Sequence, residues 1–415
     1  MGAERCPLCG CLRAHYAVAA ARMKILTFTT LYPNAARPHH GVFVETRLRH
    51  LLESDRVDAQ VVAPVPWFPS GNARYGRYAA FARTPREEQR HGIKVTHPRY
   101  LSVPKFGMNV APLLLAAAVR PMVERIVRQG YDFDILDAHY FYPDGVAAAM
   151  IGRKLNKPVM ITARGTDINL LPQFAIPRRM IQWAARHASA LVTVSAALKT
   201  ALVQLGADGS KISILRNGVD ARLFRPVDRT LHRARLGLSG TVLLMVGNLV
   251  ALKGHELVLR ALGEFPEASL LVVGDGEEQG KLIALAEELR IQHRVRFIGA
   301  MPQEELVAIY GAADALVLAS SREGWPNVLL EAMACGTPVV SSSVGGTPEI
   351  VAAPEAGVLM TERSPRGVAD ALKRLFQNYP ERSMTRRYAE RFSWDDTTSG
   401  QLTLFERILG EHKAS

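Results

Sequence analysis

The stretch SSREGWPNVLLEAMACGTP at residues 320–338 carries the clearest structural signal in the chain. It follows a short apolar run at 315–319, and its own pattern predicts a helix that opens at about Pro326. Proline fits the first helical turn because the N–H that it lacks is not needed there. A strand, a glycine-containing turn and a helix in this order are typical of a parallel α/β sheet, whose ligands bind at such turns.

This turn has residues suited to holding a sugar and an anion. Gly324 permits close backbone approach to a ligand, and the free amides of residues 325–329 would point toward an anion, aided by the helix dipole. Glu323 can accept hydrogen bonds from sugar hydroxyls, and Glu331 could accept them from ribose hydroxyls. The alternative interpretation is a helix with two ordinary surface acids.

The rest of the chain repeats the alternation of apolar runs and helical patterns. Strands are expected at 24–29, 58–63, 93–97, 135–139, 159–162 and 190–195, and then at 242–247, 269–274, 295–298, 315–319 and 338–342. Helices are expected at 43–53, 144–155, 196–205, 255–262, 276–289, 302–312, 327–334 and 348–351. Apolar strands separated by helices predict parallel sheets that are covered on both faces.

Two such stretches predict an α/β chain of two doubly wound, Rossmann-like domains. The N-terminal domain is expected at 23–220, joined by a C-terminal helix near 397–410 within 392–415, and the C-terminal domain at 221–391. The junction at 217–228 has Asn-Gly and Arg-Pro turn signals and no periodicity. Because ligands of open parallel sheets bind outside the carboxyl ends of the strands, we expect the reaction in the cleft between the domains.

Composition and charge favour a globular chain with an anionic partner. The hydrophobic content is 48% and the charged content 22%, and no stretch reaches ~18 uninterrupted apolar residues. The net charge of +12 is concentrated in residues 23–220, which hold 26 Lys or Arg and 14 Asp or Glu. Nucleic acid, anionic lipid and a phosphate-bearing substrate are the partners that such an excess suggests, and solubility alone is the alternative.

The four cysteines do not form a disulfide framework for a chain of 415 residues, so we expect a reducing cytoplasm. Three of them, Cys6, Cys9 and Cys11, lie in the run CPLCGCLRAH, where a Cys3His zinc site is an alternative to a plain extension. We expect residues 1–22 to precede the fold, because the first convincing strand starts at Met23, which could itself be the true start.

The segment around Glu323 and Glu331 resembles the E-x7-E signature of retaining glycosyltransferases of family 4, also called glycosyltransferase group 1. The resemblance covers essentially all of residues 23–414 and is greatest to bacterial exopolysaccharide and teichuronic-acid-type transferases. It implies the GT-B architecture of two facing Rossmann-like domains. It also implies that Glu323 touches the donor sugar and Glu331 the ribose, with backbone contacts to sugar and diphosphate from Gly324, Trp325, Pro326, Asn327, Val328 and Leu329.

Three further segments of the C-terminal half fit this family. In MVGNLVALKGH at 245–255, Lys253 can supply a point charge to the donor diphosphate, whereas Asn248 stands where relatives usually carry Arg. Arg164 or Arg216 could compensate for that departure. By resemblance, the turn of VVGDG with Gly274 shapes the base pocket, and VGGTPE at 344–349 provides a second backbone contact with the donor.

The N-terminal half has three places that resemble the family. Gly41, in HHGVF, lies where a glycine loop can approach the donor phosphate. His139 matches the second histidine of an H-x-H-like segment, with Asp137 in place of the first, and we expect it to face the cleft as a catalytic residue. In ARGTD, Arg164 stands where relatives carry His, so Arg164 and Asp167 could contact phosphate or the acceptor.

Together these features predict transfer of a hexose-type sugar from a nucleoside diphosphate to a hydroxyl. The family resemblance implies retention of configuration and no metal or other cofactor. Glu323, His139 and Lys253 are the expected catalytic residues. The expected acceptor is a polyprenyl-diphosphate-linked glycan or another hydroxyl compound, bound by a protein that is peripheral on the inner face of the cytoplasmic membrane. The alternatives are a GT-B-type sugar-nucleotide epimerase and a non-catalytic polyanion-binding protein, although no nucleic-acid module is recognisable.

Overall fold

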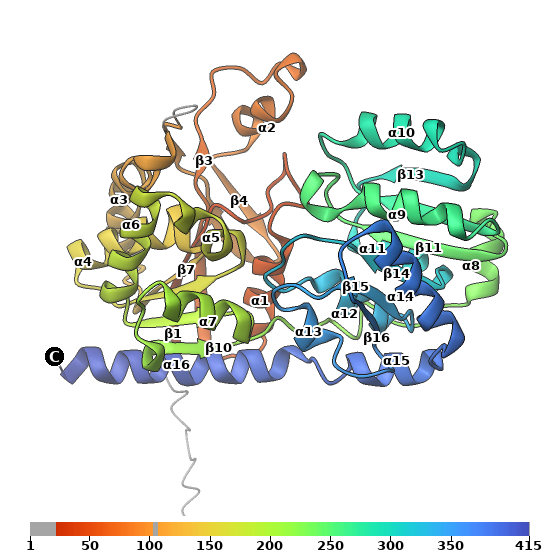
Figure 1. Ribbon diagram of the computed structural model, residues 1–415. Helices are drawn as coiled ribbons and strands as arrows, with labels where there is room; N and C mark the ends of the chain where they lie inside the picture. The colour runs from red at the N-terminus through yellow and green to blue at the C-terminus, as the bar shows by residue number, and fades with distance from the viewer. Residues whose placement is uncertain (1–21, 103–106, 415) are drawn as a thin grey trace, which may run out of the picture.

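The computed structural model describes residues 22–102 and 107–414, and two parallel β-sheets with helices on their faces form its core (Figure 1). The expected extension at 1–22, with its alternative zinc site, lies outside the described residues apart from Arg22. The two sheets come from the two halves of the chain, as the alternation of strands and helices predicts.

The first sheet has eight strands in the order β10-β9-β8-β7-β1-β2-β5-β4. All neighbours are parallel except β4, which pairs antiparallel with β5 at one edge. The strands are β1 (Met23–Phe28), β2 (Val57–Val62), β4 (Glu87–Arg90), β5 (Ile93–Thr96), β7 (Ile135–His139), β8 (Val159–Ala163), β9 (Ala190–Thr193) and β10 (Ile212–Ile214). A separate short pair consists of β3 (Val65–Pro66) and β6 (Arg99–Tyr100).

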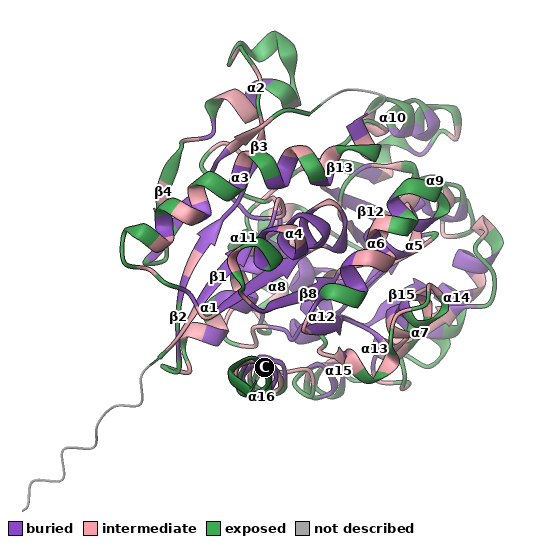
Figure 2. Cartoon of the chain, turned by 90° about the vertical axis from the view of Figure 1, so that its left-hand side faces the viewer, coloured by how far each residue is buried: buried purple, intermediate pink, exposed green. Residues whose placement is uncertain are grey.

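The second sheet has six parallel strands in the order β13-β12-β11-β14-β15-β16. They are β11 (Thr241–Val246), β12 (Ala268–Val273), β13 (Val295–Gly299), β14 (Ala315–Leu318), β15 (Val339–Ser342) and β16 (Gly357–Met360). The central strands are buried along most of their length, because helices cover both faces of a parallel sheet (Figure 2). The chain order reverses between β11 and β14, which is where doubly wound sheets bind ligands.

The helices of the first half are α1 (Val42–Leu52), α2 (Arg77–Arg83), α3 (Ala111–Arg128), α4 (Val146–Leu155), α5 (Thr166–Asn169), α6 (Ala175–His187) and α7 (Ala196–Gln204). Those of the second half are α8 (Arg229–Leu236), α9 (His255–Ala261), α10 (Gln279–Glu288), α11 (Gln303–Ala312), α12 (Asn327–Ala334), α13 (Thr347–Ile350), α14 (Pro365–Gln377), α15 (Arg382–Ala389) and α16 (Trp394–Ala414). No helix in the described part of the chain is both long and apolar enough to span a membrane.

Helix α16 crosses back from the second half to the first. It runs along the base of the first sheet in Figure 1, and Leu402, Phe405 and Ile408 are buried in one cluster with residues of β1 and β2. The chain therefore passes between the two halves twice. One crossing lies between β10 and α8 and has no regular element, and the other lies just before α16. The domain boundaries given above stay a prediction.

Two expected helices are shorter in the structure than the sequence pattern suggested. The helix expected from 276 starts at Gln279, because Gly276 lies directly against the backbone of Leu249 and belongs to a turn. The helix expected from 144 starts at Val146, after an irregular turn in which Tyr142 has extended backbone angles. Several elements were not anticipated at all, among them β4, β10, β16, α3, α6, α14 and α15.

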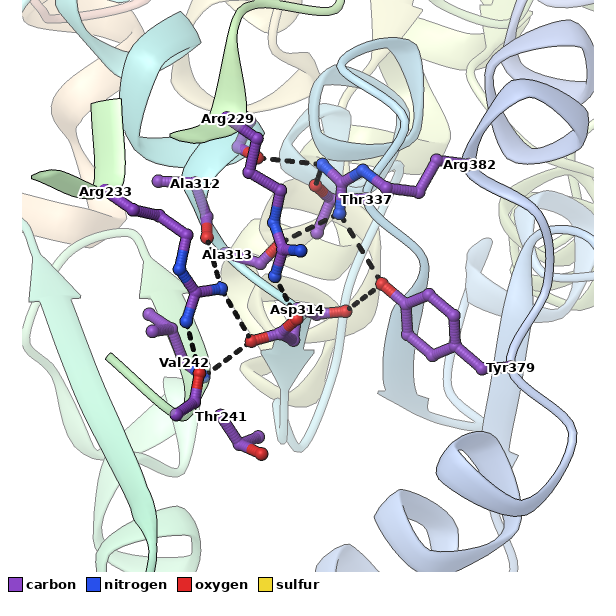
Figure 3. A network of polar contacts seen from close by, with 12 residues as sticks. Arg229, Arg233, Thr241, Val242, Ala312, Ala313, Asp314, Thr337, Tyr379 and Arg382 are labelled. Carbon is purple, nitrogen blue, oxygen red and sulfur yellow. Dashed lines mark hydrogen bonds and ion pairs between the residues drawn. The ribbon is translucent and has the colours of Figure 1, made fainter. Parts of the chain in front are cut away.

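A polar network ties α8 and α15 to the amino end of β14 (Figure 3). The carboxylate of Asp314 pairs with Arg229 and Arg233 and accepts a hydrogen bond from the backbone N–H of Val242. Arg382 of α15 donates to the carbonyl oxygen of Ala313 and to the hydroxyl of Thr337. This network lies at the opposite end of the strands from the candidate site, so we interpret it as part of the scaffold.

Candidate active site

Lys253 and Glu323 come together at the carboxyl ends of two neighbouring strands. Lys253 follows β11 and Glu323 follows β14, and these two strands pair side by side. The N–H of Ser321 donates to the carbonyl oxygen of Leu252 at 2.9 Å, which holds the two loops together. The ammonium nitrogen of Lys253 lies 2.6 Å from Oε1 of Glu323, with 21% and 11% of the two side chains exposed. The sequence pattern named both residues, and the strand order explains why they meet.

The loop that carries Glu323 also touches the N-terminal half of the molecule. A Cβ at Gly324 would overlap the carbonyl oxygen of Arg164, so only glycine allows the two backbones to lie this close. The indole N–H of Trp325 donates to the carbonyl oxygen of Asn217 at 2.9 Å. The candidate site therefore lies where loops of the two halves meet.

Helix α12 presents its amino end to this loop. It begins at Asn327, as expected, and Pro326 occupies the capping position with no side-chain hydrogen bond. The first N–H groups of a helix have no partner within the helix, so they are available to an anion. Leu329 is fully buried, so any contact that it makes with a ligand is through the backbone, whereas Val328 is half-buried.

Glu331 is buried on α12 and faces α11. The hydroxyl of Tyr310 donates to its Oε2 at 2.8 Å, and the amide of Gln303 donates to its Oε1 at 3.2 Å. Burial raises the pKa of Glu331 to about 7, although the hydrogen bonds from Tyr310 and Gln303 lower it. Its contact with a ribose stays a prediction, and such a contact would compete with Tyr310 and Gln303 for the same oxygens.

The other expected donor residues lie on loops at the same ends of the strands. Asn248 is exposed just after β11, and Gly274 packs directly against the backbone of Gly247 at the end of the next strand. In the N-terminal half, Gly41 precedes α1 and lies against the backbone of Leu31. The structure leaves the donor contacts of these three residues untested.

His139 does not face an open cleft. Only 2% of the residue is exposed, and both ring nitrogens have partners. Nη2 of Arg164 lies 2.6 Å from Nδ1, and Oδ2 of Asp137 lies 3.3 Å from Nε2. They meet because His139 ends β7 and Arg164 follows the neighbouring strand β8. Burial lowers the pKa of His139 to about 4, since Asp137 only partly offsets it. The neutral ring therefore carries its proton on Nε2, toward Asp137, and accepts from Arg164.

Neither arginine that could replace the missing family arginine lies against Lys253. The Arg164 guanidinium donates through Nη1 to Oδ1 of Asn217 at 3.1 Å and lies over the ring of Phe43. Burial lowers the pKa of Arg164 to about 9. The Arg216 guanidinium pairs with Glu349, with Nη2 2.5 Å from Oε2. Of the three cations that the sequence suggested for a donor diphosphate, Lys253 is the one that pairs with Glu323.

Asp167 holds the loop after β8 in shape. Its carboxylate accepts hydrogen bonds from the backbone N–H groups of Phe141, Arg164 and Gly165, at 2.6 to 3.1 Å. The residue is fully buried, so the contact with phosphate or acceptor that the sequence suggested would require these bonds to break. Among the residues that the structure describes, no group of three or more His, Cys, Asp or Glu could hold a metal ion, and metal-independent transfer stays a prediction.

Comparison with known families identifies the two halves. Residues 228–392 match the model described as Glycosyl transferases group 1, and residues 78–223 match the model described as Glycosyltransferase Family 4. Both halves of the chain therefore match glycosyltransferase families. The family that the E-x7-E segment suggested is therefore confirmed at this level, whereas a likeness to exopolysaccharide or teichuronic-acid enzymes is not shown.

Curated relatives of this chain include D-inositol 3-phosphate glycosyltransferases. That of Mycobacterium leprae (strain Br4923) is 37% identical over 222 residues, which are 50% of this chain and 52% of the relative. That of Mycobacterium tuberculosis (strain F11) is also 37% identical over 222 residues, which are 46% of its length. The chain spans about half the length of the curated relatives that it matches.

The match to solved structures of similar fold covers almost the whole chain. Sucrose-phosphate synthase from Thermosynechococcus elongatus has a TM-score of 0.77 and 19% identity, and the match covers 94% of this chain and 100% of that one. Anabaena HepE in complex with UDP-glucose has a TM-score of 0.69 and 22% identity, covering 95% and 100%. At these identities the match shows that the GT-B fold is shared.

Sequence reasoning missed several residues that shape the candidate site. Glu349 lies in the quoted VGGTPE segment, and its Oε1 accepts a hydrogen bond from the N–H of Ala196 at the start of α7, in the other half. Asn217 lies in the junction, where the sequence indicated only a turn. Gln401 of α16 donates to Oδ2 of Asp137 at 2.9 Å, a contact between residues 264 positions apart. The sequence pattern contains no signal for that contact.

Proposed function

We propose that this chain transfers a sugar from a nucleoside-diphosphate sugar to a hydroxyl acceptor with retention of configuration. The pairing of Lys253 with Glu323 beside the uncapped amino end of α12 is the observation that carries the proposal. It brings a cation, a hydrogen-bond acceptor and free N–H groups together at the carboxyl ends of β11 and β14, where such sheets bind nucleotides.

The proposed chemistry assigns one part of the donor to each group. Lys253 and the N–H groups at the start of α12 stabilise the charge that develops on the leaving diphosphate. Glu323 accepts hydrogen bonds from hydroxyls of the transferring sugar. The bond from the anomeric carbon to the phosphate oxygen breaks as the bond to the acceptor oxygen forms on the same face, and the donor phosphate takes the acceptor proton. This route needs neither a metal ion nor a side-chain base.

Two kinds of acceptor fit the basic N-terminal half. A polyprenyl-diphosphate-linked glycan would connect the enzyme with cell-surface polysaccharide synthesis. A phosphorylated polyol is the second candidate, because the curated relatives are named as D-inositol 3-phosphate glycosyltransferases. Both acceptors carry phosphate, which the excess of Lys and Arg in residues 23–220 would attract.

Exposed apolar side chains in the N-terminal half support contact with an anionic membrane. Leu113 at the start of α3 is 48% exposed, and Phe174 just before α6 is 45% exposed. Both helices contact the turn at Gly107–Asn109. A cavity of about 270 Å³ beside them is lined by Tyr100, Met108, Tyr142 and Leu171 among others, and it would suit an apolar portion of an acceptor.

A panel of nucleotide sugars in a thermal-shift assay tests the donor part of the proposal. The correct donor should raise the unfolding midpoint most, since a ligand at 100 times its Kd stabilises by about 2.7 kcal/mol. Lys253→Met should abolish the shift, whereas Lys281→Met, at a lysine whose side chain is 76% exposed on α10, should not. No shift with any nucleotide sugar would contradict the proposal.

Product analysis separates the proposed transferase from its rivals. NMR of the product should show the anomeric configuration of the donor, and an inverted product would refute retention. Formation of an altered nucleotide sugar in the absence of acceptor would favour the epimerase instead. A chain that binds a heparin column but shows no affinity for any donor would favour a polyanion-binding protein.

A further inference from the structure

Asn217, in the crossing between the two halves, contacts both sides of the candidate site. Its side-chain Oδ1 accepts from Nη1 of Arg164 at 3.1 Å, and its Nδ2 donates to Oδ1 of Asn327 at 3.2 Å. Its backbone carbonyl oxygen accepts from the indole of Trp325 at 2.9 Å. The residue is only 4% exposed. One buried side chain thus connects the first sheet to the loop and helix that follow Glu323.

The position of Asn217 along the chain coincides with the place where the two crossings touch. A Cβ at Gly218 would overlap the backbone of Ser393 and Trp394 in the second crossing. The N–H of Val219 donates to the carbonyl oxygen of Phe392 at 2.8 Å. Both crossings connect the two halves, so a rotation of one half relative to the other must bend the chain at these touching segments. Asn217 therefore lies on the hinge, and its side chain reaches the site.

A buried chain of polar groups fixes the partner of Asn217 on the N-terminal side. Arg164 donates to His139, whose other nitrogen faces Asp137. The amide of Gln401 donates to Asp137, and Nε of Arg47 donates to Oε1 of Gln401 at 2.9 Å. These contacts are buried or part-buried, so Arg164 cannot turn away without breaking a chain that reaches α1 and α16.

We infer that Asn217 is a positioning residue, which holds the loop of Glu323 and the start of α12 against the N-terminal half. Arg164 and His139 act through it, so in this chain they serve closure and not proton transfer. The inference rests on the proposed function, because it takes the Glu323 loop as the place of transfer. A second contact between the halves, from Glu349 to the start of α7, is independent of Asn217 and should keep the fold intact in its absence.

Hydrogen exchange of the full chain without any ligand tests this inference. Asn217→Leu keeps the size of the side chain and removes its hydrogen bonds. We expect exchange of the amides at 325 and 327–330 to rise about tenfold, with the amides of β14 within about twofold of wild type. Asn217→Asp should behave like wild type, because a carboxylate still accepts from Arg164 and the amide of Asn327 can turn to donate. Asn378→Leu, at an exposed asparagine, is the matched control.

The outcomes distinguish the inference from simple loss of stability and from failure of the proposed function. Unchanged exchange at 325–330 in Asn217→Leu would overturn it, as would an equal rise across all strands of the second sheet. Fast exchange in Asn217→Asp would overturn the role of Arg164. The exchange result needs no substrate, so it stands even if no nucleotide sugar binds. With UDP as a calorimetric probe, Asn217→Leu should lower kcat about tenfold on any donor found while UDP affinity stays within about twofold.

Discussion

Replacement of Glu331 by Gln should make the protein more stable above neutral pH. Burial raises the pKa of this carboxyl from its usual 4.5 to about 7 in the folded chain. The folded state therefore binds the proton more tightly than the unfolded state. The stability that this contributes is fully present below pH 4.5 and is lost as the pH rises through about 7. A glutamine cannot ionise, so the variant keeps the stability that the wild type loses.

The magnitude follows from the size of the pKa change. A rise from 4.5 to about 7 corresponds to about 3 kcal/mol as an order of magnitude, at 1.36 kcal/mol for each pH unit. For a domain of this size that is roughly 6–12 °C in the unfolding midpoint. The hydrogen bonds can survive, because Gln accepts from Tyr310 through its oxygen and can donate to Gln303 once that amide turns.

Thermal unfolding of the full chain between pH 4.5 and 8.5 is the assay. The difference in midpoint between Glu331→Gln and wild type should grow with pH and level off above about pH 7. Glu287→Gln, at an exposed glutamate on α10, is the matched control and should show no such growth. A difference that stays flat across the range would refute the reasoning. Glu331→Gln should also bind nucleoside diphosphates more weakly, so its stability and its affinity should change in opposite directions.

Three further predictions follow from the proposed function. Transfer should continue in EDTA, because Lys253 and the start of α12 take the place of a cation, and loss of activity that Mg²⁺ or Mn²⁺ restores would contradict this. Glu323→Gln should lower kcat by roughly 10- to 150-fold, the worth of one charge-assisted hydrogen bond, with nucleoside-diphosphate affinity nearly unchanged in calorimetry. Leu113→Asp should reduce co-sedimentation of the full chain with anionic vesicles, whereas Leu231→Asp on α8, 44% exposed in wild type, should not.

The fold could be predicted because its strands are buried on both faces. Such strands are continuous apolar runs, so the predicted bounds of β7 agree with the structure to the residue, and those of most other central strands agree within one or two positions. The predicted bounds of the helix α12 also agree to the residue. The short edge strands β4, β10 and β16 lack that signal. Their residues are partly exposed or few in number, and pairing with a neighbour determines them more than their own pattern does.

The candidate site was predictable to the extent that chain topology determines it. Residues that follow strands of one parallel sheet must gather at one edge, which is why Lys253 and Glu323 meet. What a side chain contacts beyond that edge depends on the packing of segments far apart in sequence. Gln401 reaches Asp137 from α16, and this contact contributes to the burial that keeps His139 from the cleft. No local pattern indicates such a contact.

The two departures from the family pattern have related consequences in the structure. With Asn at 248, we expect binding of the diphosphate to rely on Lys253 and on the helix amides. With Arg at 164, a permanent cation is added next to the first crossing, where Asn217 and His139 accept its hydrogen bonds. Compared with the family pattern, this chain thus lacks a cation at residue 248 and has an additional one, Arg164, beside the hinge. We expect donor affinity to depend strongly on Lys253 and closure to depend on Arg164, so Lys253→Met and Arg164→Met should affect different measurements.

Lys253→Met should weaken nucleoside-diphosphate binding with little change in amide exchange at 325–330. Arg164→Met should speed that exchange with little change in affinity, and identical profiles for the two variants would contradict this division of roles.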